Sequence, residues 1–231
     1  YAEALPMERA SALAAEIRAA DDFGHPVAIH QNSALSFDFA QDPRFDQFAI
    51  QWNPPVDADE LHSRLAELFR HSSGRFNLNF AERDGHGLAP PDQVRRLNWA
   101  AALGGAYVMV YQWDIASTPE EGLRQCGHMV RFMESTPFSG MRPASDLALE
   151  ETRFVMAGSG GEYIGYTRPG HGRLGLKEVV GGTYEVRWMD VESGETVTDT
   201  LSHPAAGSMI FARPESLGPE LAFFLRLIPE S

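Results

Sequence analysis

The stretch RFNLNFAERDGHGLAPPDQVRRLNWAAALGGAYVMVYQW (75–113) decides the fold of this chain. It contains two β-rich runs, 75–82 and 106–113, with a helical segment at 90–105 between them. Prolines mark the start of that helix, and glycines follow its end. The second run is nearly continuous in apolar residues, as expected for a strand buried on both faces. This order predicts two parallel strands joined by a helical crossover.

The same alternation extends in both directions along the chain. Two more β-rich runs, PVAIHQ (26–31) and FDQFAIQW (45–52), precede the quoted stretch. Helical stripes of apolar residues flank these runs. The stripes are Ala10, Leu13, Ala14 and Ile17; Leu61, Leu65, Leu68 and Phe69; and Leu123, Cys126, Val130 and Met133. Four strand–helix units in sequence predict an α/β parallel sheet or barrel over residues 1–146.

The pattern changes after about residue 140. The irregular segment FSGMRPASDLALEE (138–151) indicates a domain junction, and around seven short β-rich runs follow it. The stretch GSGGEYIG (158–165) lacks both GxGxxG spacing and a following helix, so it predicts a hairpin turn and not a phosphate-binding loop. Residues 147–231 are therefore predicted to form an all-β, antiparallel sandwich.

Composition excludes several classes of function. The formal charge of −13 disfavours nucleic acid and anionic membranes as partners, because it repels phosphates. No apolar run has the length of a membrane span. The single cysteine, Cys126, forms neither an internal disulfide nor a thiolate metal site, and it is expected to be a small buried apolar residue. His25 and His30 point to opposite faces of an extended segment. No metal or other cofactor is predicted.

Polar and aromatic residues gather where each predicted parallel strand ends. Ligands bind at the carboxyl ends of strands in parallel α/β folds and in (β/α)8 barrels. Carboxylates and amides hold sugar hydroxyls, and indoles stack on sugar faces, so this collection resembles a saccharide site. The predicted substrate-binding residues are His30, Gln31, Gln51, Trp52, Arg83, Asp84, His86, Gln112, Trp113 and Asp114.

Glu82 is the candidate catalytic residue. A carboxylate that closes an apolar strand is partly desolvated, which makes its pKa tunable by a neighbour such as Arg83 or an indole. Glycoside hydrolysis uses two carboxylates, one as acid and one as nucleophile or base. Asp84 and Asp114 are the two candidates within this chain for the second carboxylate.

Strand geometry leaves the orientation of Glu82 open. Strict alternation places it on the same face as Phe76, Leu78 and Phe80. A Glu82 side chain inside a barrel therefore requires one of two arrangements. Either the Phe/Leu face is the interior, or the end of the strand carries a bulge.

The order of these features resembles the C-terminal half of a (β/α)8 glycoside hydrolase of the large retaining clan with two catalytic glutamates. More narrowly, it resembles the bacterial apiosidase-like family, whose barrel is followed by a β-sandwich named a collagen-binding domain. The segments similar to barrel strands five to eight are HPVAIHQ (25–31), FDQFAIQW (45–52), FNLNFAERDGHG (76–87) and AYVMVYQW (106–113). Similar stretches outside the strands are the helix at 90–106 and, in the tail domain, 153–170 and 183–197.

The resemblance implies a fold and roles for individual residues. It implies a fold made of strands 5–8 of a (β/α)8 TIM barrel with their helices, followed by the β-sandwich. Glu82 matches the strand-seven carboxylate, the nucleophile in retaining members. Trp113 matches an aromatic residue that floors the sugar site, and His30 matches a substrate contact on strand five. The family's acid/base residue on strand four has no counterpart here. An N-terminal half-barrel is therefore expected in the same polypeptide or in a second chain.

The sequence leaves three functional interpretations. The first is a glycoside hydrolase acting on a plant or bacterial oligosaccharide or polysaccharide. The second is a non-catalytic glycan- or protein-binding module with a degenerate barrel site. The third is another α/β enzyme with an open sheet, in which Asp84 and His86 act as an acid–base pair. The sequence begins almost inside a helix, so it is expected to be a mature product or a piece of a longer protein. The location is left open between secreted or periplasmic and cytoplasmic, in a bacterium.

Overall fold

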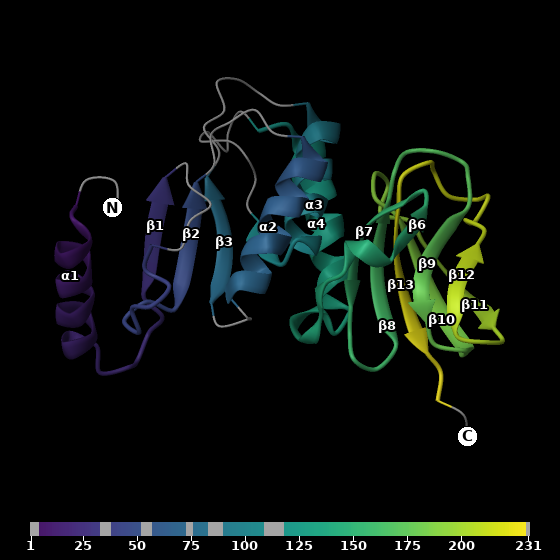
Figure 1. The fold of residues 1–231 in the computed structure, drawn as a ribbon. Helices are drawn as coiled ribbons and strands as arrows, with labels where there is room; N and C mark the ends of the chain where they lie inside the picture. The colour runs from purple at the N-terminus through teal and green to yellow at the C-terminus, as the bar shows by residue number, and fades with distance from the viewer. Residues whose placement is uncertain are drawn as a thin grey trace. The chain divides into compact units, whose positions relative to one another are not determined.

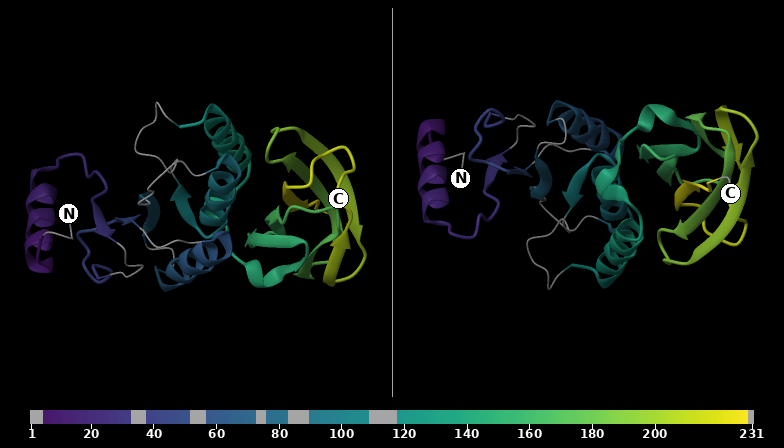
Figure 2. Two further views of the ribbon diagram at one scale, coloured as in Figure 1. Left: turned by 90° about the horizontal axis from the view of Figure 1, so that it is seen from above. Right: turned by 90° about the horizontal axis from the view of Figure 1, so that it is seen from below.

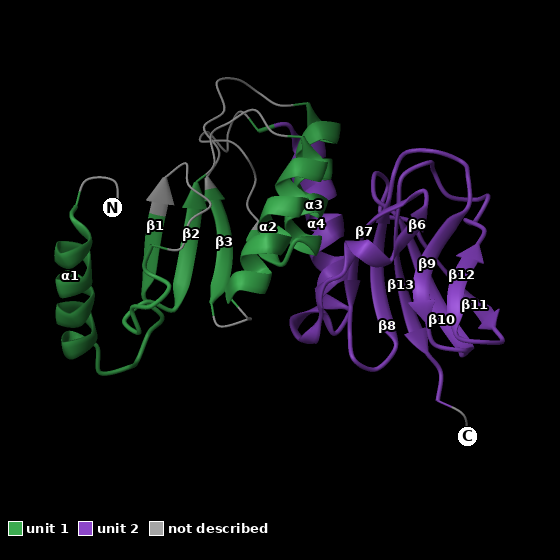
Figure 3. Ribbon diagram, in the orientation of Figure 1, with its two compact units in different colours: residues 1–118 green, residues 119–231 purple. Residues whose placement is uncertain are grey.

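The computed structural model of the chain describes residues 5–32, 38–51, 57–72, 76–82, 90–108 and 118–229. Within these residues a parallel sheet with helices comes first, and antiparallel strands dominate the second half (Figures 1 and 2). The chain divides into two compact units, residues 1–118 and residues 119–231 (Figure 3). The predicted mixed α/β composition is confirmed.

The first unit is built around a four-stranded parallel sheet with the strand order β1-β2-β3-β4. The predicted parallel pairing of consecutive strands is therefore confirmed. The described part of the last strand ends at Val108, and residues 109–117 lie outside the described part. The elements are α1 (Met7–Ala20), β1 (Ala28–Asn32), β2 (Gln47–Gln51), α2 (Ala58–Ser72), β3 (Asn77–Glu82), α3 (Pro91–Leu103) and β4 (Ala106–Val108).

One face of this sheet supplies the core of the unit. Residues that pair across neighbouring strands form rows that run across the sheet, and successive rows face opposite sides. Two of the rows that face the same side carry the buried side chains. The described buried side chains in these rows are Ile29, Phe48, Leu78 and Ala106 in the first, and Ile50 and Phe80 in the second. Leu61, Leu65 and Leu68 of α2 are buried as predicted. In α3 the buried apolar side chains include Val94, Leu97 and Trp99. Apolar rows and helical stripes together make the core.

Local signals in the sequence begin and end the two core helices. Asp57 accepts a hydrogen bond from the Glu60 N–H at 2.8 Å, which satisfies a free donor in the first turn of α2. α3 begins at Pro91 and ends before Gly104, as the prolines and glycines predict. Gly105 follows with φ of +86°, and a Cβ at this position would lie 2.4 Å from the Phe69 ring. Only glycine fits both constraints.

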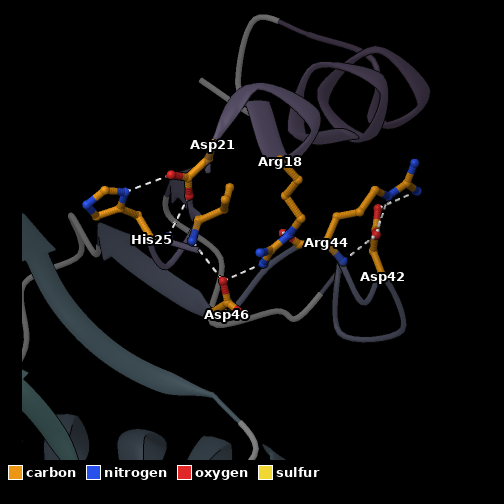
Figure 4. Close-up of polar contacts among 7 residues, drawn as sticks. Arg18, Asp21, His25, Asp42, Arg44 and Asp46 are labelled. Atoms are coloured by element: carbon orange, nitrogen blue, oxygen red, sulfur yellow. Dashed lines mark hydrogen bonds and ion pairs between the residues drawn. The ribbon is translucent and has the colours of Figure 1, made fainter. Parts of the chain in front are cut away.

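A charged cluster ties α1 to the amino ends of β1 and β2 (Figure 4). Asp46 accepts hydrogen bonds from the Arg18 Nη2 at 2.5 Å and from the Val27 N–H at 2.8 Å. The stripe predicted for α1 is only partly correct, because Ala10 and Ala14 are buried whereas Ile17 is 55% exposed. Polar contacts of Arg18, and not the apolar side chain of Ile17, therefore attach the C-terminal end of α1 to the sheet.

Asp42 belongs to the same region and gives a prediction on acid stability. The Asp42 carboxylate accepts hydrogen bonds from Arg44, the shortest of them from the Arg44 Nε at 2.6 Å. These bonds hold the pKa of Asp42 at about 2. A carboxyl with a lowered pKa stabilises the folded state above pH 4, and this contribution is lost as the pH falls towards 2. Asp42→Asn is expected to lower the free energy of unfolding by about 1–2 kcal/mol at pH 7, and by much less near pH 2.5.

Urea unfolding of the variant at the two pH values measures this effect. Asp22→Asn is the matched control, because Asp22 is exposed on the neighbouring α1–β1 connection. An equal loss of stability for Asp42→Asn at both pH values would contradict the assignment of the effect to the charge.

The second unit contains helix α4 and two antiparallel sheets. The six-stranded sheet has the order β11-β10-β13-β8-β7-β5, and the three-stranded sheet has the order β12-β9-β6. Between β7 and β8 lies the predicted hairpin turn at 158–161, where the Gly158 N–H donates to the Glu162 carbonyl at 2.9 Å. The elements are α4 (Glu120–Glu134), η2 (Phe138–Gly140), β5 (Arg142–Pro143), η3 (Ser145–Leu147), β6 (Ala148–Glu150), β7 (Thr152–Ala157), β8 (Glu162–Thr167), β9 (Leu174–Val179), β10 (Gly182–Asp190), β11 (Thr196–His203), β12 (Gly207–Phe211) and β13 (Leu221–Leu227).

The two antiparallel sheets share one hydrophobic core. Three aromatic rings lie at its centre. The Trp188 ring centroid is 5.8 Å from that of Phe211 and 5.7 Å from that of Phe223, and the last two are 5.4 Å apart. These residues come from both sheets, so the core joins the sheets to each other.

Helix α4 packs differently from the sequence prediction. Leu123 and Val130 are 38% and 44% exposed, so the predicted buried stripe is wrong for these two residues. The buried positions include His128, Met129 and Phe132. The predicted stripe follows aliphatic spacing, whereas the buried face of the helix combines the polar His128 with Met129 and Phe132.

Arg187 of β10 explains this choice of face. Its guanidinium lies 5.1 Å from the Phe132 ring of α4 and 5.6 Å from the Phe224 ring of β13. Its Nη2 also donates to the Ser135 Oγ at 2.7 Å, at the C-terminal end of the helix. Cation–π contacts and a hydrogen bond therefore anchor α4 on the six-stranded sheet. This anchoring places α4 in the second unit, although the predicted domain boundary at 146/147 lies after the helix.

His128 gives a second prediction on pH. Burial lowers the pKa of its imidazole, the nearby Arg124 and Arg131 lower it further, and Glu121 and Asp190 act in the opposite direction. Since the unfolded state takes up the proton first, the stability of the protein is expected to fall as the pH drops below about 6.5. His128→Gln is expected to flatten the dependence of the unfolding temperature on pH between 8 and 5. An unchanged slope in this variant would contradict the prediction.

Candidate functional site

The face of the parallel sheet opposite the buried rows is polar. In β2 the side chains of Gln47, Ala49 and Gln51 alternate with the buried Phe48 and Ile50. One row on this polar face runs through all four strands, and a second lies nearer their carboxyl ends. The first row is His30, Ala49, Asn79 and Tyr107, and the second is Asn32, Gln51 and Glu82.

A bulge in β3 decides the row to which Glu82 belongs. Phe80 pairs with Ile50, but the next residue of β2, Gln51, pairs with Glu82. Ala81 is therefore an extra residue in β3, opposite no residue of its own in β2. The bulge shifts the alternation, so Glu82 shares a row with Gln51 and does not continue the row positions of Leu78 and Phe80. Of the two arrangements that the sequence left open, the register shows the bulge.

The predicted site residues divide into three groups. Gln51 and Glu82 share the row at the carboxyl ends of β2 and β3, and His30 lies in the next row of the polar face, two residues before the end of β1. Gln31 instead pairs with Ile50, which puts its backbone in a buried row. The remaining seven residues lie outside the described residues, so their place in the site stays a prediction. These are Trp52, Arg83, Asp84, His86, Gln112, Trp113 and Asp114.

In the two rows nearest the carboxyl ends, three polar or aromatic residues were absent from the predicted substrate-binding residues. Asn32 shares a row with Gln51 and Glu82, whereas Asn79 and Tyr107 share the row below with His30. Tyr107 is 55% exposed. The alternation of Asn77 and Asn79 with apolar residues was the available signal, but the cross-strand pairing that joins these residues to His30 is not visible in one sequence.

The charged cluster around α1 lies at the opposite ends of the strands. Asp46 directly precedes β2, and Val27 directly precedes β1. In parallel barrel folds the amino-terminal ends of strands serve stability and the carboxyl ends carry the chemistry. The ion pairs of Figure 4 are therefore structural, and the candidate site is the edge at Asn32, Gln51 and Glu82.

Two further observations concern other kinds of site. Among the described residues, no group of three His, Cys, Asp or Glu side chains is arranged to hold a metal ion. No helix in the described part of the chain has the length and apolar character of a membrane span.

Comparisons with known proteins relate the fold to that of glycoside hydrolases. No family model matches the chain, and no curated protein matches it. Solved structures do match. A protein described as a glycoside hydrolase has a TM-score of 0.65 at 14% identity, covering 95% of this chain and 61% of that one. A glycoside hydrolase family 5 protein from Bacteroides vulgatus has a TM-score of 0.63 at 14% identity, covering 94% of this chain and 58% of that one.

A third match is a family 30 subfamily 8 xylanase from Clostridium acetobutylicum. Its TM-score is 0.53 at 9% identity, with coverage of 94% of this chain and 59% of that one. This chain thus spans about three fifths of the length of these structures. At such identities the likeness shows the fold, which is glycoside hydrolase-like.

Proposed function

We propose that this chain is the C-terminal part of a (β/α)8 glycoside hydrolase, a half-barrel followed by a β-sandwich, similar to the apiosidase-like family. The observation that carries the proposal is the row Asn32–Gln51–Glu82. It places the backbone of a glutamate at the carboxyl edge of a parallel sheet, in a fold that resembles those of glycoside hydrolases. The substrate is a plant or bacterial oligosaccharide or polysaccharide.

Glu82 acts in this proposal as the nucleophile or the base of glycoside cleavage. As nucleophile it attacks the anomeric carbon, and as base it takes a proton from the attacking water. A second carboxylate protonates the leaving oxygen. His30 and Gln51 bind sugar hydroxyls, together with the predicted residues Trp52, Arg83, Asp84, His86, Gln112, Trp113 and Asp114.

The second carboxylate is proposed to come from an N-terminal half-barrel, in the same polypeptide or in a second chain. Two observations support this proposal. The described sheet ends at β1 and β4, each with a partner strand on one side only. Met7 and Ile17 of α1 are half exposed, at 50% and 55%, as expected for a helix that lacks a neighbour.

The alternative function is a non-catalytic glycan- or protein-binding module. One observation favours it: in the rows described for the polar face, Glu82 is the single carboxylate residue, and amide residues are the most numerous polar ones. A face rich in amides suits the binding of sugar hydroxyls without cleavage.

Hydrolysis by the whole natural polypeptide separates the two functions. Its intact mass, compared with 25.5 kDa, shows whether an N-terminal half is attached. A panel of plant and bacterial polysaccharides and aryl glycosides is then assayed for released reducing sugar. Release of sugar from at least one substrate is expected. Binding to a glycan without any cleavage would overturn the hydrolase proposal in favour of the binding module.

A further inference from the structure

Strand β11 forms one edge of the six-stranded sheet. Its eight residues, Thr196–His203, pair with β10 on one side, and no described strand pairs with them on the other side. Five of these eight residues are exposed. An exposed edge of this length presents a row of backbone donors and acceptors with which another chain can pair.

Backbone hydrogen bonds of β10 show which residues of β11 face the open edge. The Thr183 carbonyl accepts from the Ile228 N–H, just after β13, at 2.8 Å. The Asp190 N–H donates to the Glu195 carbonyl, just before β11, at 2.9 Å. Backbone groups alternate in direction along a strand, so Thr183 and every second residue after it in β10 face β13. The partners of these residues in β11 point their N–H and C=O groups to the open edge; they are Thr196, Thr198, Thr200 and Ser202.

The side chain of Asp199 interrupts the apolar face of β11. Asp199 pairs with the buried Val186 of β10, and on either side of it Val197 and Leu201 pack against the core. Alternation therefore puts a carboxylate on the core-facing side in the middle of the strand. Its Oδ1 accepts a hydrogen bond from the Thr200 N–H at 2.7 Å, so it occupies one donor of the open edge. An inward-facing charge is one means by which natural edge strands avoid pairing.

The strand is symmetric in residue type about Asp199. Similar residues lie at equal steps from Asp199 in the two directions: Thr198 and Thr200, Val197 and Leu201, and Thr196 and Ser202. Two antiparallel copies of β11, with a two-fold axis at Asp199, would set each residue opposite its counterpart. In this register the hydroxyl residues, whose backbone groups face the open edge, form the hydrogen-bonded pairs. Backbone and side chains therefore favour the same register.

The same register brings two carboxylates together. Asp199 lies on the axis, opposite its own copy in a non-hydrogen-bonded pair, where Cα atoms are about 4.5 Å apart. Like charges directly opposite each other destabilise a pair of strands. Each carboxylate also holds the Thr200 N–H that the pairing requires. The formal charge of −13 adds repulsion between two copies of the chain.

We propose that β11 is a self-complementary edge that pairs antiparallel with β11 of a second copy, and that the Asp199 carboxylate keeps unaltered copies apart. The partner is a second copy because a pattern symmetric about one residue suits an isologous contact. This inference concerns the assembly of the protein and does not depend on cleavage of a glycoside.

Sedimentation velocity of the whole polypeptide tests the proposal. Asp199→Thr removes the charge and supplies a residue that favours strands. It is expected to double the sedimenting mass relative to the unaltered protein at equal concentration. Glu195→Gln is the matched control, because Glu195 is exposed, directly precedes β11 and lies outside the symmetric stretch. It removes the same charge and is expected to leave the mass unchanged.

A proline locates the contact. Thr198→Pro removes an N–H that points to the open edge and leaves the hydrogen bonds to β10 in place, a position at which edge strands accept proline. Added to Asp199→Thr, it is expected to restore the mass of the unaltered protein. Amide exchange over residues 196–202 gives a readout that needs no proline. In Asp199→Thr this exchange is expected to slow as the protein concentration rises.

The outcomes are distinct. A doubled mass in Asp199→Thr that Thr198→Pro reverses, together with slower exchange over 196–202, supports the proposal. An unchanged mass in Asp199→Thr overturns the self-pairing. A doubled mass that persists in the folded double variant, or that leaves exchange over 196–202 unchanged, overturns the assignment to β11. An unaltered protein whose mass halves with Thr198→Pro alone overturns the role of Asp199. The unfolding temperature of each variant identifies those that are folded, and exchange decides if the double variant is not.

Discussion

Replacing Glu82 by glutamine is expected to lower kcat/KM for glycoside cleavage by at least about a thousandfold. The amide has the shape of the carboxylate but neither attacks an anomeric carbon nor accepts a proton from water. Since Glu82 ends β3 and its backbone pairing with Gln51 is independent of its side-chain charge, the fold is expected to persist. Initial rates on the best substrate of the panel, with circular dichroism as a check of folding, measure the effect.

Two variants serve as controls for this result. Asp84→Asn and His86→Gln remove the pair that would act in an open-sheet α/β enzyme. If Glu82→Gln retains most of the activity while these two variants lose it, Glu82 is not the reactive group and the acid–base pair takes its place. The anomeric configuration of the sugar released by the unaltered protein separates the two roles of Glu82, because a nucleophile gives retention of configuration and a base gives inversion.

Replacing Gly165 by alanine is expected to destabilise the second unit by about 3 kcal/mol or more, or to prevent its folding. Gly165 lies in β8 and pairs with Phe223 of β13. A Cβ at Gly165 would lie 2.0 Å from the Phe223 ring. The ring has nowhere to move, because it packs against Trp188 and Phe211 at the centre of the core. Urea unfolding measures the loss.

Gly122→Ala is the matched control for the same chemical change. Gly122 lies in the first turn of α4, and a Cβ there would meet no atom within 4 Å. Alanine at this position is expected to stabilise the helix by about 0.5–1 kcal/mol. Phe223→Leu, combined with Gly165→Ala, is expected to recover part of the lost stability. A loss below about 1 kcal/mol for Gly165→Ala alone would contradict this account of the contact.

The parallel sheet was predictable because its signals are local. Apolar runs alternate with helical stripes, and prolines and glycines mark the ends of α3. Two positions of the predicted α4 stripe were wrong for the opposite reason. Leu123 and Val130 have the right spacing, but the helix turns another face inward because Arg187, from a distant strand, holds Phe132. A contact between residues 55 positions apart leaves no periodic signal in either segment.

The candidate site shows the same division. Polar residues at strand ends pointed to the carboxyl edge, and Glu82, Gln51 and His30 lie in adjacent rows there. The bulge at Ala81, and the place of Asn32 in the row with Gln51 and Glu82, depend on how β2 pairs with β1 and β3. The sequence of one strand does not contain this pairing. The roles of the seven predicted residues outside the described ranges remain predictions.

The anchoring of α4 on the second unit bears on how such genes recombine. In chain order the helix follows the last parallel strand, yet Arg187 and Ser135 attach it to the antiparallel sheet. A chimera of two related proteins that is joined between residues 146 and 147 would take Phe132 and Arg187 from different parents, so their contact would be lost. A joint before Pro119 keeps helix and sheet together. Chimeras joined before Pro119 are therefore expected to fold more often, and surviving natural fusions to share that joint.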